Sequence, residues 1–288
     1  MAETPAVSII MPAYKQAEYI AEAIESVKRQ TCQSWELIIV DDGSPDNVAE
    51  VVAPFCEADN RIKFYHTENT GVSAARNFAA SKTKGEYLLP LDADDTIEPT
   101  YIEKCLNRFA EHPETDVVYC KWHFFGDARK TPKLRYKGYD ELLQTNGIFV
   151  SAMIRKASFE VIGGYDENMY RGMEDWEFWI RFLNHKSIVY QIPEELFNYR
   201  IKKNSRNVEA KKQEQFFDIE MYVMGKHRDK YLTLFGRPIQ AINEALKYKR
   251  KYYNIWYKKL WYSCARLLGN DILKRRFNGN KLSDSDPV

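Results

Sequence analysis

The chain has 288 residues, of which 44% are hydrophobic and 29% are charged, and its net charge at pH 7 is +1. This length and composition fit one large α/β domain, alone or with a helical extension. No stretch approaches the roughly 20 apolar residues that a bilayer requires, which excludes a predicted transmembrane helix. No signal peptide is recognisable and the five cysteines form no CxxC pair, so we expect a cytoplasmic protein.

Charge is unevenly distributed along the chain. Residues 1–120 carry 10 basic and 21 acidic side chains, whereas residues 201–288 carry 20 basic and 9 acidic ones. We therefore expect the last segment to be a separate element with an anionic partner.

Four short apolar or β-branched runs near the start predict buried strands. They are Val7–Met11, Glu36–Val40, Ile62–Tyr65 and Glu86–Leu91. Apolar residues at helical spacing predict helices between these runs, and Ser44 is expected to cap the second helix with Pro45 at its first position. This alternation predicts βαβ units and a mostly parallel sheet, in which the carboxyl ends of the strands share one edge.

The pattern changes after residue 113. Strands are predicted at 117–122 and 148–154, with a loop-rich insertion at 126–145 between them. A helix rich in Trp and Phe is predicted at 174–183, and the chain is expected to be mainly helical from about residue 208.

Three carboxylates, Asp92, Asp94 and Asp95, directly follow the fourth predicted strand. Because such acids repel one another, a bound Mg²⁺ or Mn²⁺ is the usual compensation. A calcium loop of the EF-hand type is disfavoured, since Ile97 stands where that loop needs Gly. An acidic surface turn stays open. Asp41 and Asp42 end the second strand in the same way, as a plain turn or as a nucleobase or ribose contact.

Four ordered motifs carry a resemblance to a known family. They are VSIIMPAY at 7–14, QT at 30–31 followed by ELIIVDDGS at 36–44, GVSAARN at 71–77 and LDADD at 91–95. Over roughly residues 5–205 the chain resembles family 2 glycosyltransferases of the GT-A fold. The resemblance implies a GT-A domain at 1–207, with a nucleotide-sugar-binding half at 1–112 and an acceptor-binding half at 113–207. A basic, aromatic helical extension would then occupy 208–288.

The resemblance also implies roles for individual residues. Asp94 would bind the metal, and Asp175, in the sequence Met173-Glu174-Asp175-Trp176, would be the general base. The residues expected to bind the nucleotide-sugar are Pro12, Ala13, Tyr14, Asp41, Asp42, Arg76, Asp92, Ala93, Asp94 and Arg200. Supporting roles fall to Asp95, Glu174, Lys202 and Ser205. Many relatives place a His where this chain has Lys202, so the third metal ligand stays open.

The implied function is inverting, metal-dependent transfer of a single sugar from a nucleotide-diphospho-sugar, with a UDP-sugar expected, to a glycan or lipid-linked acceptor. Bacterial surface polysaccharide is the expected product. The alternatives are a sugar-phosphate nucleotidyltransferase, disfavoured by the absence of a Gly-rich basic loop after the first strand, and a non-catalytic sugar-nucleotide-binding scaffold.

Aromatic and basic residues alternate in the tail, at 247–253 and 256–262. This composition suits a helix on an anionic membrane surface, and it also suits packing against the domain or against a second copy in a homo-oligomer. Nucleic acid is not the expected partner. Membrane contact through residues 240–288 would make the protein peripheral on the inner face of the plasma membrane.

Overall fold

The computed structural model describes residues 4–126, 135–169, 172–202, 213–237, 243–244 and 247. The chain divides into two compact units, Met1–Lys226 and His227–Val288. In the second unit the structure describes helix α10 (Arg228–Phe235). All the strands and the remaining named helices belong to the first unit, which holds every site residue that the structure describes.

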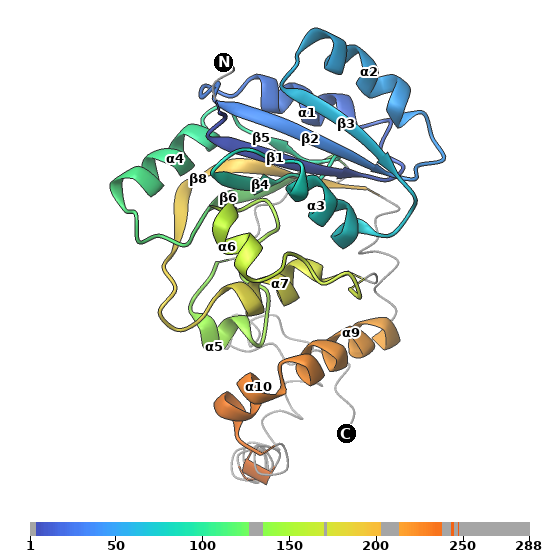
Figure 1. The fold of residues 1–288 in the computed structure, drawn as a ribbon. Helices are drawn as coiled ribbons and strands as arrows, with labels where there is room; N and C mark the ends of the chain where they lie inside the picture. The colour runs from blue at the N-terminus through green and yellow to red at the C-terminus, as the bar shows by residue number, and fades with distance from the viewer. Residues whose placement is uncertain are drawn as a thin grey trace, which may run out of the picture. The chain divides into compact units, whose positions relative to one another are not determined.

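The first unit is built on an eight-stranded mixed sheet with the order β3-β2-β1-β4-β7-β6-β8-β5 (Figure 1). The strands are β1 Val7–Ala13, β2 Trp35–Asp42, β3 Ile62–Thr67, β4 Tyr87–Pro90, β5 Thr96–Ile97, β6 Val117–Gly126, β7 Met153–Arg155 and β8 Val189–Ile201. The first four pair in parallel, as do β6 and β8, whereas β7 and β5 pair antiparallel. This confirms the predicted α/β fold.

Helices follow the strands in the alternating order that the sequence predicts for its first half. They are α1 Ile20–Lys28, α2 Val48–Ala58, α3 Val72–Ser81, α4 Tyr101–Glu111, α5 Tyr139–Leu142, α6 Lys156–Val161, α7 Glu174–Phe182 and α9 Gln213–Lys226. In Figure 1, α1 and α2 lie on one side of the sheet, and α3 and α6 lie on the other. Because both faces are covered, β1 and β2 are buried at every position and are mostly apolar in their central residues.

Two local predictions are wrong. The run 148–154 contributes only the short strand β7, and its earlier part is a buried loop in which Phe149 stacks on Phe197 with ring centroids 4.5 Å apart. In this segment the apolar run therefore indicates buried side chains but not a strand. Ser44 does not cap α2, which begins at Val48; its Oγ instead accepts the backbone N–H of Lys15 at 3.1 Å.

The end of helix α9 is tied to the rest of the first unit by a partly buried ion cluster. Lys226 Nζ lies 2.5 Å from Asp166 Oδ2 and 2.8 Å from Glu177 Oε1, and the Glu177 side chain is fully buried. The first compact unit thus includes α9 up to Lys226.

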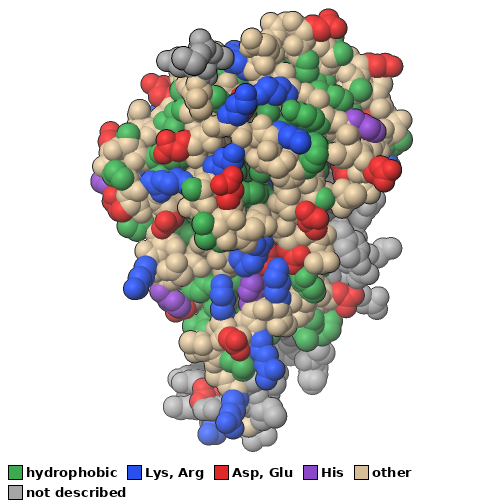
Figure 2. All heavy atoms as spheres, in the orientation of Figure 1, with side chains coloured by type: hydrophobic (Ala, Val, Ile, Leu, Met, Phe, Trp, Pro, Cys, Tyr) green, Lys and Arg blue, Asp and Glu red, His purple; other side chains and the backbone are tan. Residues whose placement is uncertain are grey.

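Acidic and basic side chains are interspersed on the face of the molecule that Figure 2 shows. The described helices include none that is both long and apolar enough to cross a bilayer.

Candidate active site

The ends of neighbouring parallel strands gather the predicted site residues of the first half. In β1, Ala13 pairs in register with Asp41 of β2, and Ile10 pairs with Pro90, the last residue of β4. The acidic run 92–95 begins two residues after that strand ends. Open α/β sheets bind ligands at this edge, so the topology supplies the expected place for a site.

The carboxylates of Asp41 and Asp42 are buried and organise the loops around them. Asp42 accepts the backbone N–H groups of residues 70–71 at 2.8 and 2.9 Å. Asp41 accepts the N–H of Ser44 at 2.9 Å, and its other oxygen lies 2.8 Å from Nδ1 of His66. Both acids therefore shape the edge of the sheet, whatever they bind.

Pro12 and Ala13 are buried at the end of β1, and the chain then turns outward. Tyr14 follows with 42% of its side chain exposed, and Lys15 adopts the left-handed φ of 57° that non-glycine residues rarely adopt. The backbone of Lys15 is held by Ser44, so the exposed aromatic ring of Tyr14 is presented from a fixed turn.

Arg76 joins the two halves of the domain. It is 1% exposed, and its guanidinium donates to Asp92 Oδ1 at 2.7 Å and to Glu174 Oε1 at 2.8 Å. The ring of Tyr165 lies 5.2 Å from the guanidinium carbon. Although burial opposes its charge, Asp92 and Glu174 hold the pKa of Arg76 above its ordinary value. The structure thus places Arg76 as a buried bridge between these carboxylates.

Asp175 lies in the first turn of α7, after Met173, whose φ of 59° is left-handed. Its Oδ1 accepts the N–H of Trp176 at 2.8 Å, and its Oδ2 accepts Nδ2 of Asn146 at 2.8 Å. Burial and the neighbouring Glu174 raise the pKa of Asp175 to about 7. A carboxylate with a pKa near neutrality is suited to take up a proton.

The acidic run meets positive charge from the end of β8. Lys202 Nζ lies 2.5 Å from Asp94 Oδ2. Arg200 donates its backbone N–H to Asp95 Oδ1 and its Nε to the Asp94 carbonyl, both at 2.8 Å, and its guanidinium pairs with Glu22. Arg200 and Lys202 therefore reach the predicted acidic run, and Ala93 is buried within it.

Asp95 is itself buried and only partly satisfied. Its Oδ2 has no hydrogen-bond partner, and burial together with Asp94 and Asp92 raises its pKa well above the ordinary range. Among the residues that the structure describes, no three His, Cys, Asp or Glu side chains converge as a complete metal site. Asp94 is the residue of the run that could hold a divalent ion, with phosphate oxygens or water as the other ligands, and Lys202 Nζ already lies beside its Oδ2.

Ser205 and most of the tail from residue 240 lie outside the described residues. Asn146 belongs to the site but was not predicted, because a lone Asn in a loop-rich segment carries no sequence signal. It lines a cavity of about 210 Å³ together with Arg135, Tyr136, Lys137, Glu141, Leu142, Thr145 and Gly147.

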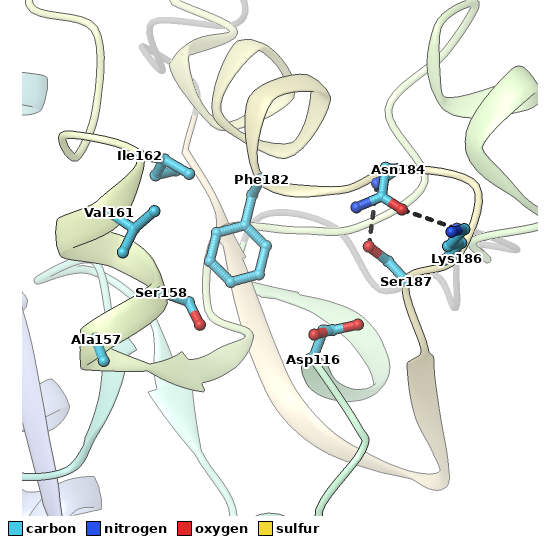
Figure 3. A pocket seen from close by; sticks show the side chains of 9 residues that line it. All are labelled: Asp116, Ala157, Ser158, Val161, Ile162, Phe182, Asn184, Lys186 and Ser187. Carbon is cyan, nitrogen blue, oxygen red and sulfur yellow. Dashed lines mark hydrogen bonds between the residues drawn. The ribbon is translucent and has the colours of Figure 1, made fainter.

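A larger cavity of about 550 Å³ lies at the opposite end of α7. Figure 3 shows Phe182 in its middle, with Val161 at the end of α6 and the following Ile162 on one side and Asn184 on the other. Phe182 is seven positions from Asp175, which is about 10 Å along a helix. The larger cavity is therefore not adjacent to the Asp175 carboxylate.

Comparisons with known proteins agree with the family resemblance of the sequence motifs. The family described as "Glycosyl transferase family 2" matches residues 8–163. The chain is 40% identical over 130 residues to EpsH of Bacillus subtilis strain 168, covering 45% of this chain and 37% of EpsH. It is 31% identical over 212 residues to the glycosyltransferase MJ1057 of Methanocaldococcus jannaschii, covering 69% of this chain and 72% of MJ1057.

A structural match shows the same fold. The crystal structure of S. aureus TarS 1–349 in complex with UDP-GlcNAc superposes with a TM-score of 0.64 at 20% identity, covering 85% of this chain and 74% of that one. The chain spans only about two fifths of the length of EpsH.

Proposed function

Because the chain belongs to glycosyl transferase family 2, we propose that it transfers a single sugar, with inversion, from a nucleotide-diphospho-sugar to a hydroxyl of a glycan or lipid-linked acceptor. The observation that carries this proposal is the position of the half-buried Asp175, whose pKa is raised to about 7, directly beside Glu174, which Arg76 joins to Asp92. The base and the acidic run thereby belong to one connected site. We propose the assembly of a bacterial surface polysaccharide as its setting.

In the proposed reaction, Asp175 takes the proton of the acceptor hydroxyl while the hydroxyl oxygen forms a bond to the anomeric carbon. The bond between that carbon and the diphosphate oxygen breaks in the same displacement, so the anomeric configuration inverts. We place the acceptor in the cavity beside Asn146, because Asn146 both lines that cavity and donates a hydrogen bond to Asp175.

The donor is proposed to lie along the strand ends, with its base near Tyr14 and its ribose near Asp92. A UDP-sugar is the proposed donor, since the structurally similar TarS is found with UDP and with UDP-GlcNAc. Asp94 would hold Mn²⁺ or Mg²⁺, which supplies charge neutralisation for the diphosphate leaving group. Lys202 and Arg200 add positive charge at the same place.

A thermal-shift experiment tests the donor site. UDP-GlcNAc with Mn²⁺ should raise the melting temperature by about 5 °C at a concentration near 100 times Kd, because only the folded state binds it. GDP- and dTDP-sugars serve as comparison ligands. Asp94→Asn should remove most of the dependence of this shift on Mn²⁺, since it removes the proposed metal ligand.

Asp59→Asn is the matched control. Asp59 precedes β3 and pairs with Arg61, at the amino end of the sheet, so its loss should leave the metal-dependent shift intact. A metal dependence that survives in Asp94→Asn would contradict the assignment of Asp94. No shift with any sugar nucleotide would contradict the donor site.

The basic, aromatic tail is proposed, from its sequence, to bind an anionic membrane surface. Replacing Lys249, Arg250 and Lys251 with Gln in the full chain should therefore weaken co-sedimentation with vesicles that contain phosphatidylglycerol, by about 1 kcal/mol for each charge. Purely zwitterionic vesicles are the control. Equal binding of both proteins to the anionic vesicles would remove the tail from this role.

A further inference from the structure

We propose that Asn146 is a positioning residue for the reaction: it fixes Oδ2 of Asp175 in the orientation in which the carboxylate receives the acceptor proton. The inference rests on the proposed role of Asp175 as base and adds a residue that no sequence motif marks.

The orientation of the Asn146 amide is determined by an unambiguous donor. The backbone N–H of Ile148 donates to Asn146 Oδ1 at 3.2 Å, so the oxygen must point that way. The amide nitrogen then points to Asp175 Oδ2, 2.8 Å away. Because Trp176 N–H holds Oδ1 of the same carboxylate, both oxygens of Asp175 are fixed by donors from different segments.

The segment that carries Asn146 is anchored to the helix that carries the base. The indole N–H of Trp176 donates to the carbonyl of Leu142 at 2.6 Å, and the hydroxyl of Tyr139 donates to the carbonyl of Ile180 at 2.9 Å. Both bonds are buried. Asn146 therefore meets Asp175 from a loop whose position relative to α7 is set at two other points.

The charged groups around Asp175 have opposing effects on its ionisation. Glu174 disfavours the ionised form of Asp175, and the buried Arg76 favours it. The phenol groups of Tyr165 and Tyr199 also interact electrostatically with the Asp175 carboxylate. An amide N–H on Oδ2 stabilises the ionised carboxylate without adding a charge that would pair with it permanently.

Asn146 also lines the cavity of about 210 Å³, whose other walls come from residues 135–137, 141–142, 145 and 147. The amide nitrogen has two hydrogens, and one is used by Asp175. Its second hydrogen is therefore available to a hydroxyl oxygen that enters this cavity. The same side chain would then contact the base and orient the incoming nucleophile.

The test is a direct titration of Asp175 in the full chain. In protein labelled with ¹³C at the Asp carboxyl carbons, the Asp175 signal is identified by its absence from Asp175→Asn. The wild-type midpoint is expected at about pH 7. Asn146→Ala should raise it by about one pH unit, since it removes one hydrogen bond to the ionised form. Asn146→Asp should raise it further, because a second carboxylate then faces the first.

Thr145→Ala is the matched control, because Thr145 lines the same cavity and has no hydrogen bond to Asp175. It should leave the midpoint unchanged. An unchanged midpoint in both Asn146 variants, with native circular dichroism, would overturn the positioning role, as would an equal shift in Thr145→Ala.

The rate of UDP-GlcNAc hydrolysis supplies a second measurement. Asn146→Ala should lower kcat at pH 7 and leave KM for the sugar nucleotide unchanged, and higher pH should restore part of the rate. The titration needs no activity. A chain that turns over no sugar nucleotide, yet shows the Asn146-dependent midpoint, would overturn the proposed function and keep the contact.

Discussion

Replacing Asp175 with Asn should lower the rate of sugar transfer by about 10²- to 10⁴-fold, the usual contribution of a general base. The substituted side chain keeps the shape of Asp175 but cannot take up a proton at neutral pH. Binding of the sugar nucleotide should survive, since the proposed donor contacts lie at the strand ends. The measurement is release of the nucleoside diphosphate, with donor binding followed by calorimetry.

Asp140→Asn is the control for this substitution. Asp140 lies on α5, is exposed and pairs with His185 rather than with the site, so its loss should leave the rate unchanged. Transfer at the wild-type rate by Asp175→Asn would show that another group takes the proton.

Replacing Arg76 with Met should lower the free energy of unfolding by about 3–5 kcal/mol, the range measured when one partner of a buried ion pair is removed. The substitution would leave Asp92 and Glu174 without their shared cation. Because only 10% of the Glu174 side chain is exposed, water could not replace that cation well. Urea denaturation of both proteins gives the difference.

Lys137→Met is the matched comparison, because Lys137 pairs with Glu141 on the surface, where both side chains are well exposed. A surface pair of this kind contributes less than about 1 kcal/mol. Equal losses of stability for the two variants would mean that Arg76 is not the buried bridge that its contacts indicate.

Much of the fold follows from local patterns in the sequence. The apolar runs of β1 and β2 are long enough and sufficiently β-branched to specify buried strands, and α1 between them is amphipathic. The run 148–154 misled the prediction because apolar side chains report burial, and a loop packed under aromatic rings is buried too. Phe149 shows this, since its ring stacks on Phe197 from outside any strand.

The candidate site was predictable where its chemistry is concentrated in short motifs. Asp92, Asp94 and Asp175 each lie beside a recognisable strand end or helix start. Contacts between segments that are distant in the sequence could not be predicted from such motifs. Asn146 is 29 residues from Asp175 and Arg200 is 178 residues from Glu22, and no periodicity connects such pairs.

The bridge made by Arg76 limits how the two halves of this domain can be recombined. Its cation comes from α3, within residues 1–112, and one of its two carboxylates, Glu174, comes from residues 113–207. A chimaera that joins residues 1–112 to the second half of another relative would bury an unmatched charge unless that relative supplies an acid at the position of Glu174. Under the proposed function, new acceptor specificities should therefore be introduced by exchanging the loop around 135–147, with Glu174 and its helix retained.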